Sequence, residues 1–343
     1  MTILCLVRDK IEGTWAAFSD CLITSDEHDE GIALHTPNRL FQDERTTHGF
    51  AEVRLEEKLG LLGDNCLFGW ENSRHEASAL VREIKSIGTK SFDFDTLAGR
   101  KLKNSYLIVT EDQSWPGSKI RLISNKERSE FFDGDRFTVH ASGSGRGLID
   151  RLKFTSAGGG ISALGIGGDV ADAALKLMVK YLSEELGGSR SQFYSLRTGG
   201  WFSMFLPAPD GIYQYRFCFN HWSMGLNGEP LVSHIVIPWQ QDGINFALTF
   251  LVNDDWKLEY RSAIAILPLL DLQRNVHITI SPADVILNYK ADSTFHYCWN
   301  SESHKCFAVP LAEPHFRADG EFLHKLPHSE VTISNVRRLL AEP

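Results

Sequence analysis

The sequence predicts an α+β protein with a mixed N-terminal part and a strand-rich C-terminal part. Apolar strand patterns open the chain at residues 3–24, and amphipathic helical repeats follow at 73–84 and 169–186. After these helices the pattern becomes mostly that of strands separated by turn residues. We therefore expect two domains, at residues 1–214 and 215–343, of which the second is a β-rich accessory domain.

Composition and charge exclude some classes of protein. Of the 343 residues, 43% are hydrophobic and 23% are charged, which is ordinary for a globular protein with a sizeable core. A net charge of -9 argues against a general nucleic-acid binder, whose affinity rests on a positive surface. The six cysteines are spread along the chain, and we interpret them as reduced thiols.

We expect a cytoplasmic protein. No apolar run approaches the roughly 18 residues that a membrane-spanning helix needs. The segment Met1–Val7 is too short for a signal peptide.

The first half of the chain supplies the elements in a clear order. Two strands end near Thr24 and a polar loop follows at 25–47. A strand, a tight turn and a strand occupy residues 58–71, and Ser73 with Glu76 forms the capping-box pattern of a helix that Gly88 ends. The next elements are a short helix at 95–103 and strands at 105–110 and 119–124.

A glycine-rich stretch at 158–168 precedes the most regular helix pattern. A glycine loop at a helix start can bind phosphate, but this one lacks the Lys-Ser/Thr of a P-loop and a preceding buried strand. We interpret it as a connector. Asp169 is the expected cap of the helix, and Gly187 is its expected end.

The C-terminal part is read as strands that end in a small helix. The predicted strands lie at 233–239, 245–252, 257–267, 276–280, 285–290 and 295–300, and the helix at 335–340. His296, Cys298, His304 and Cys306 flank a short turn and have the side chains of a tetrahedral zinc site, although their spacing is not a standard one. Facing residues of a β-hairpin explain the same pattern, so we expect no metal and no cofactor.

Thr2 is the first candidate catalytic residue. Removal of Met1 next to a small side chain would leave Thr2 with a hydroxyl and an α-amine on one residue. An α-amine with a pKa of about 7.7 to 8 can accept the hydroxyl proton near neutral pH. This is one of the known ways to activate a weak nucleophile.

The residues that follow Thr2 resemble the proteasome β-subunit family of N-terminal nucleophile hydrolases. The resemblance covers residues 1 to about 214 and begins with Thr2-Ile3-Leu4-Cys5-Leu6-Val7 and Ala16-Ala17-Phe18-Ser19-Asp20-Cys21-Leu22-Ile23-Thr24. It implies that Asp20, rather than Ser19, is the family's active-site Asp. Lys58, at the start of Glu57-Lys58-Leu59-Gly60-Leu61, takes the place of the active-site Lys. An ammonium there would lower the pKa of the Thr2 amine and hydroxyl.

Three more segments carry the resemblance. Ser142 in Val139-His140-Ala141-Ser142-Gly143 falls on the family's active-site serine, and Thr198 before Gly199-Gly200 replaces a second serine. Two positions depart from the family. Ser195 stands where a carboxylate would order the serine and the amine, and Asn72 stands where a glycine provides the backbone N–H of the oxyanion hole.

The resemblance implies a fold and an assembly as well as a chemistry. We expect a four-layer αββα sandwich for residues 1–214, a homo-oligomeric ring, a peptide or protein substrate, and an ATP-dependent unfoldase or regulator as partner. Two functions stay open: a threonine-type peptidase or amide hydrolase, and a catalytically impaired member of the fold that acts as a scaffold. Fold alone does not decide between them.

Overall fold

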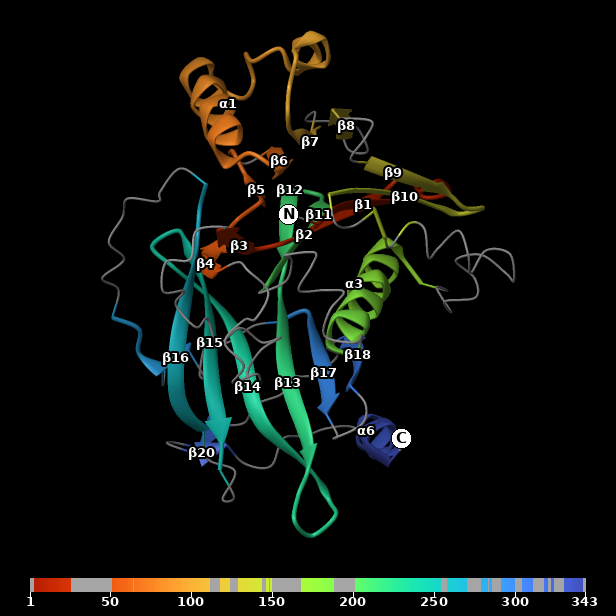
Figure 1. The fold of residues 1–343 in the computed structure, drawn as a ribbon, viewed down its shortest axis with the longest axis vertical. Coiled ribbons are helices and arrows are strands. Elements are labelled where there is room, and N and C mark those ends of the chain that lie inside the picture. The colour runs from red at the N-terminus through yellow and green to blue at the C-terminus, as the bar shows by residue number, and fades with distance from the viewer. Residues whose placement is uncertain are drawn as a thin grey trace. The chain divides into compact units, whose positions relative to one another are not determined.

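A computed structural model describes most of the chain. The described residues are 3–25, 51–63, 65–111, 118–123, 129–143, 146–147, 149, 168–187, 201–253, 258–269, 279–282, 284–285, 291–299, 304–310, 318–319, 322–323 and 330–341. The chain divides into two compact units, shown as ribbons in Figure 1. The first comprises Met1–Leu177, Phe193–Tyr215 and Leu267–Gln273; the second comprises Met178–Gln192, Arg216–Ile266 and Arg274–Pro343.

A six-stranded sheet in the first unit has the two N-terminal strands at its centre. The strand order is β12-β11-β2-β1-β10-β9. The bounds are β1 Ile3–Asp9, β2 Trp15–Asp20, β9 Ser129–Asp133, β10 Phe137–Gly143, β11 Phe202–Ala208 and β12 Gly211–Tyr215. All neighbours are antiparallel. Except at Arg8, the side chains of β1 and β2 are buried, which explains their nearly continuous apolar sequence.

A four-stranded antiparallel sheet is the second large element of this unit. Its strand order is β5-β6-β7-β8, with β5 Leu59–Leu61, β6 Cys66–Glu71, β7 Ser105–Glu111 and β8 Ser118–Ile123. The side chains of β6 alternate between two cores, since Phe68 and Trp70 pack with helix α1 (Arg74–Ile87) whereas Leu67 packs with β1. Both faces of β6 are therefore covered.

Helix α1 begins and ends at the residues that its caps predict. The Ser73 hydroxyl accepts a hydrogen bond from the Glu76 amide (3.4 Å), and the Gly88 amide donates to the Ile84 carbonyl. The Glu76 carboxylate does not return to Ser73; it accepts from the amides of Lys103 and Asn104. Glu76 thus joins the helix start to the segment before β7.

The two sheets of the first unit pack on each other through a shared core. Leu4 and Leu6 of β1 meet Leu67 of β6 and Leu107 of β7 in this core. A Cβ atom on Gly69 would lie only 2.6 Å from Leu4 Cδ1, so the absence of a side chain at Gly69 permits the close approach of β1 and β6.

The remaining elements of the first unit are short, apart from helix α3, which continues into the second unit. Strand β3 (Leu22–Ser25) pairs with β4 (Ala51–Glu56), and the 3-10 helix η1 occupies Phe94–Gly99. Helix α3 spans Val170–Gly187, as predicted.

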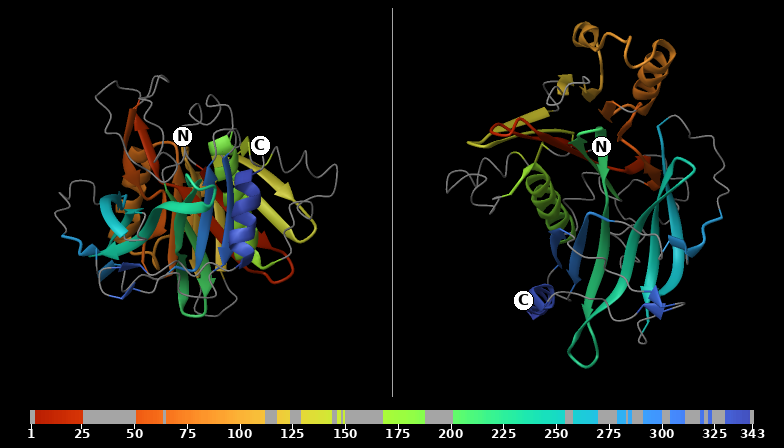
Figure 2. Two further views of the ribbon diagram at one scale, coloured as in Figure 1. Left: turned by 90° about the horizontal axis from the view of Figure 1, so that it is seen from below. Right: turned by 180° about the vertical axis from the view of Figure 1, so that it is seen from behind.

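The second unit is rich in strands. Its strand order is β18-β17-β13-β14-β15-β16, and β17 runs parallel to β13 while the other neighbours are antiparallel. The bounds are β13 Phe217–Met224, β14 Pro230–Gln241, β15 Ile244–Val252, β16 Leu258–Leu267, β17 Ser293–Trp299, β18 His304–Pro310, β19 Ala318–Asp319 and β20 Phe322–Leu323. Helix α6 (Glu330–Ala341) inserts Val336 and Leu340 into the core of this sheet. Figure 2 shows these strands from two further directions.

The prediction of a four-layer αββα sandwich is wrong. The described residues are mostly strands arranged in three larger sheets, and their longer helices are α1, α3 and α6. Of these, α6 packs into the strand core of the second unit. A four-layer sandwich needs a layer of helices over the outer face of each sheet, and this small set of helices does not supply two such layers.

The structure bears on two further expectations, concerning membrane-spanning helices and two of the C-terminal strands. No helix among the described residues is long and apolar enough to cross a membrane. The strands predicted at 276–280 and 285–290 lie mostly outside the described residues.

Candidate active site

A buried ion pair joins the two sheets of the first unit. Lys58, immediately before β5, places its Nζ atom 2.9 Å from Oδ2 of Asp20 at the end of β2. The side chain of Lys58 is 1% exposed and that of Asp20 is 0% exposed. A lysine is almost never buried this far without a charged partner, and both residues are candidates that the family resemblance implied.

The same Asp20 carboxylate fixes the first described residue of the chain. Its Oδ1 atom accepts a hydrogen bond from the Ile3 amide at 2.8 Å. The Ser19 hydroxyl donates to the Ile3 carbonyl oxygen at 2.7 Å. Both backbone groups of Ile3 are thus held by the end of β2. Thr2 itself lies outside the described residues.

Backbone hydrogen bonds hold the segment that carries Lys58. The Lys58 carbonyl accepts from the Trp70 amide (2.9 Å), and the Glu57 amide donates to the Leu267 carbonyl (2.9 Å). The Glu56 amide donates to the carbonyl of Cys21 (2.8 Å), next to Asp20. These bonds fix the backbone position of Lys58, from which its ammonium group extends to Asp20.

The buried thiols of Cys21, next to Asp20, and of Cys5 are protonated at neutral pH. Burial raises the pKa of the Cys21 thiol to about 12, while its contact with the Ser203 hydroxyl (3.6 Å) acts in the opposite direction. Burial likewise raises the pKa of Cys5, in the middle of β1. Because the thiolate is the nucleophilic form, neither cysteine is suited to attack a substrate.

Ser142 lies on the strand next to β1. It is opposite Leu4 in the register of β10 and β1, and opposite residues share a face of an antiparallel pair. The residue is 1% exposed, and its Oγ atom has no hydrogen-bond partner among the residues that the structure describes. Such a buried hydroxyl beside the start of β1 is available to a group that enters the site.

Asn72 keeps a backbone conformation that favours glycine. Its φ angle is 87°, in a region where asparagine is among the tolerated residues. Its side chain donates from Nδ2 to the Lys103 carbonyl at 3.2 Å. An asparagine is therefore compatible with the backbone conformation at this position.

The other predicted site residues are not brought together here. Ser195 and Thr198 lie outside the described residues. In the hairpin of β17 and β18, Cys306 is opposite Tyr297 and Cys298 is opposite Lys305, so the register places the two cysteine positions on different faces of the sheet. Within the described residues no group of three or more His, Cys, Asp or Glu side chains could hold a metal ion.

Sequence reasoning missed Glu71. This residue ends β6 and is 1% exposed. Along β6 the residues alternate between the α1 side and the β1 side, and Glu71 shares the β1 side with Leu67 and Gly69. Strand periodicity gives the face of β6 on which Glu71 lies, but its burial depends on the packing of β1 against that face.

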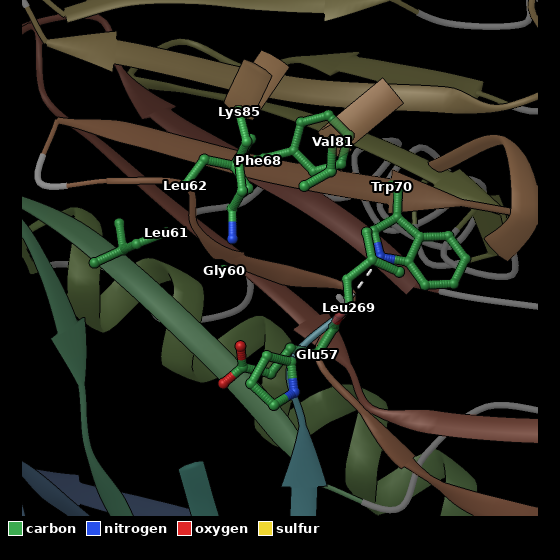
Figure 3. Close-up of a pocket in the computed structure, with 10 residues that line it drawn as sticks. Glu57, Gly60, Leu61, Leu62, Phe68, Trp70, Val81, Lys85 and Leu269 are labelled. Carbon is green, nitrogen blue, oxygen red and sulfur yellow. Dashed lines mark hydrogen bonds between the residues drawn. The ribbon is translucent and has the colours of Figure 1, made fainter. Parts of the chain in front are cut away.

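A cavity of about 160 Å³ lies on the α1 side of β6, and residues next to Lys58 in the sequence contribute to its lining. Phe68, Trp70 and Val81 line it, together with Glu57, Gly60, Leu61, Leu62, Lys85, Pro268 and Leu269. Figure 3 shows the Lys85 ammonium and the Glu57 carboxylate entering it. Since Phe68 and Trp70 point away from Leu4, this cavity is separate from the ion pair.

No protein-family model matches the chain, and no curated protein matches it in sequence. The chemistry of the site therefore rests on its own geometry: a buried ammonium, two buried carboxylates, an unpartnered hydroxyl and a fixed first strand. In this arrangement Asp20 binds the Ile3 amide at the start of β1, and the Lys58 ammonium is its buried countercharge.

Proposed function

We propose that the chain is a threonine-type amide hydrolase that cleaves peptides or related amides. Its nucleophile is the Thr2 hydroxyl, carried by the N-terminal residue once Met1 has been removed. The observation that supports the proposal is the buried Lys58–Asp20 pair, whose carboxylate also binds the Ile3 amide. Ile3 follows Thr2 directly in the chain, so the pair binds the neighbour of the proposed nucleophile.

The proposed reaction has two halves. The Thr2 α-amine, through a water molecule, takes the hydroxyl proton while the oxygen attacks the amide carbonyl. The tetrahedral intermediate then expels the amine of the substrate, which leaves with that proton, and an ester on Thr2 remains. A water molecule next attacks the ester, gives its proton to the α-amine and releases the acid. The proton returns to the Thr2 oxygen.

Each neighbouring residue has a role in this scheme. The Lys58 ammonium favours the deprotonated forms of the hydroxyl and the amine, and Asp20 keeps the ammonium in place. Ser142 supplies a hydroxyl to the amine or to the bridging water. The backbone N–H of Asn72 is the proposed donor to the oxyanion, and Thr198 is proposed to orient the amine.

The assembly and the setting are part of the proposal. Subunits form a closed oligomer that encloses the sites and receives a peptide or unfolded protein, with an ATP-dependent unfoldase or regulator as partner. The protein acts in the cytoplasm.

The first experiment tests the nucleophile. Intact mass should show loss of one Met, and a threonine-directed electrophile should add once to the wild-type protein. Thr2→Ala should abolish the adduct, while Thr2→Ser, which keeps a hydroxyl, should retain it. Circular dichroism and the melting temperature should be the same for all three proteins, because residue 2 precedes the buried part of β1.

Two results would contradict the hydrolase proposal. Equal labelling of Thr2→Ala would show that the electrophile reacts elsewhere. Retention of Met1 would block the amine, and the scaffold function would then be the better explanation.

A further inference from the structure

We propose that the cavity beside the second half of β1 binds a small organic acid that has one carboxylate and an aromatic or branched apolar body. The cavity has a volume of about 370 Å³, and small-molecule sites typically have volumes of about 300 to 1,000 Å³. Arg8, which lines it, lies about 17 Å along β1 from Ile3 at about 3.4 Å per residue. The cavity is therefore distinct from the site around Lys58 and Asp20.

One wall of the cavity is a face of the six-stranded sheet. Leu6 of β1 is opposite His140 of β10, and His140 is opposite Phe131 of β9. Arg8 is opposite Thr138 in the next row of β1 and β10. Because opposite residues share a face of an antiparallel pair, these side chains form two adjacent rows on one surface. All five residues line the cavity.

The other wall comes from the four-stranded sheet. Leu122 of β8 lines the cavity and is opposite Leu107 of β7, which packs with Leu6 in the core between the sheets. Leu122 is 38% exposed and Phe131 is 52% exposed, whereas Leu6 is 2% exposed, so the lining runs from the buried core to solvent. An apolar ligand body placed here would remove the Leu122 and Phe131 side chains from water, which favours binding.

The charges around the cavity leave one cation for a ligand. Among the residues that the structure describes, the Arg8 guanidinium has no hydrogen-bond or ion-pair partner. The Asp9 carboxylate is bound by Arg136 at 2.7 Å, and the Asp133 carboxylate is bound by Lys10 at 3.1 Å. Both carboxylates thus have other cations as partners. A guanidinium can bind a ligand carboxylate through two parallel hydrogen bonds.

His140 and Thr138 add neutral hydrogen-bonding groups to the same wall. Burial lowers the pKa of His140, so its imidazole is neutral at pH 7 and has one N–H to donate. The Thr138 hydroxyl, opposite Arg8, is a second donor. One guanidinium with two neutral donors suits a monoanion. A phosphate monoester carries up to about two negative charges at neutral pH and would have one charge without a partner.

The test uses fluorinated probes whose binding is followed by 19F NMR titration at pH 7.5. The probe 4-fluorophenylacetate should bind with a dissociation constant of about 1 mM or below, as expected for a ligand of about 11 non-hydrogen atoms. The uncharged 4-fluorophenylacetamide and the compact anion trifluoroacetate should each bind at least about 10-fold more weakly, because each lacks one half of the recognised chemistry.

Variants of the lining residues locate the binding. Arg8→Gln should weaken the binding of 4-fluorophenylacetate at least about 10-fold, as expected for lost hydrogen bonds to a charged group. Arg8→Lys, which keeps the charge without the planar fork, should give a smaller loss. Phe131→Ser should weaken binding about 3- to 10-fold through the lost aromatic contact. Both side chains are exposed, so the variants should keep the melting temperature of the wild type.

Two residues of helix α1 provide matched controls. Arg82→Gln removes an exposed arginine, and Ile87→Ser removes an apolar side chain that is 50% exposed. Neither residue lines the cavity. Both variants should bind 4-fluorophenylacetate as tightly as the wild type does.

The other possible outcomes would overturn the proposal. Absence of binding at up to about 10 mM 4-fluorophenylacetate would show that the cavity takes no such acid. Equal affinity for the amide or for trifluoroacetate would show that only one half of the chemistry is recognised. Unchanged affinity in Arg8→Gln would place the binding elsewhere, and equal or tighter binding of 4-fluorophenyl phosphate would contradict a monocarboxylate ligand. The titration involves no catalysis, so each of these results leaves the hydrolase proposal as it stands.

Discussion

Because the Lys58 ammonium is buried, its charge affects the stability of the protein as well as the proposed chemistry. Desolvation of two ions costs several kcal/mol, and their mutual attraction offsets this cost only while both are present. The 2.9 Å contact with Asp20 and the Asp20–Ile3 hydrogen bond replace part of the hydrogen bonding to water that these groups lose on burial. A change at Lys58 should therefore affect stability as well as catalysis.

We predict that Lys58→Met and Asp20→Asn each lower the free energy of unfolding by about 3 to 5 kcal/mol, because each leaves one group of the pair buried without its partner. The double variant should be less unstable than the sum of the two single variants. Urea unfolding measures all four proteins. Strict additivity would show that the two side chains are not energetically coupled.

Hydrolysis by Lys58→Met should fall at least about 100-fold, as expected for loss of one electrostatic stabiliser.

The family resemblance singled out Asp20 and Lys58 as candidates but not Glu71. The first two follow from a hairpin and a strand start whose order resembles a known family. Glu71 ends an apolar run, where a polar residue commonly marks the strand's exit to solvent. Its burial depends on β1 crossing over Gly69, a contact between segments about 65 residues apart that no local pattern encodes.

Strand β6 connects the ion pair to the packing of the sheets. It contributes Phe68 to the α1 core and Leu67 to the β1 core. A Cβ atom added to Gly69 would lie within 3 Å of both Leu4 Cδ1 and Leu59 Cδ1, so these two side chains pack closely over Gly69. Small changes in side-chain volume at this point should displace the start of β1.

We predict that Gly69→Ala destabilises the protein by about 1 to 3 kcal/mol through overpacking. The added Cβ would be 2.6 Å from Leu4 Cδ1 and 2.9 Å from Leu59 Cδ1. Combining Gly69→Ala with Leu4→Val, which shortens one of these side chains, should recover part of the loss. Gly99→Ala, where a Cβ meets nothing within 4 Å, is the control and should change stability little. Equal effects of the two alanines would contradict the close approach.

Elements with strong local signals were predicted well. Caps defined α1, and apolar periodicity located α3, β7 and β8. The helix predicted at 95–103 is the shorter η1, and the C-terminal helix α6 begins at Glu330 rather than at residue 335. Helix ends depend on contacts such as those of Glu76 with Lys103 and Asn104, which lie outside the helix itself.

The architecture of the whole molecule was the least predictable level. The family resemblance implied helical layers around a pair of sheets, yet strands dominate both units. The parallel pairing of β13 with β17 joins residues about 75 apart. Periodicity identifies which residues form strands, whereas the partner of each strand depends on long-range packing.

Both units contain a histidine whose pKa is lowered by burial. His140 of β10 in the first unit lines a cavity of about 370 Å³ together with Arg8, Asp9 and Lys10. His234 of β14 lies in the second unit, and the nearby Arg261 adds to the effect of burial. In each case the folded protein binds a proton less readily than the unfolded chain, whose histidines have an ordinary pKa of about 6.5.

The final prediction is that stability is constant between about pH 6.5 and 7.5 and decreases as the pH falls toward the lowered pKa values of these histidines. In this range the unfolded chain takes up protons that the folded protein does not, so acid favours unfolding. Urea unfolding at pH 7.5, 6.5 and 5.5 measures the slope. His140→Gln and His234→Gln should each make it shallower, and if the units unfold in separate transitions each variant should alter the slope of the unit that carries it. An increase in stability on acidification to pH 5.5 would contradict the prediction, since it would mean that the folded protein binds the additional protons.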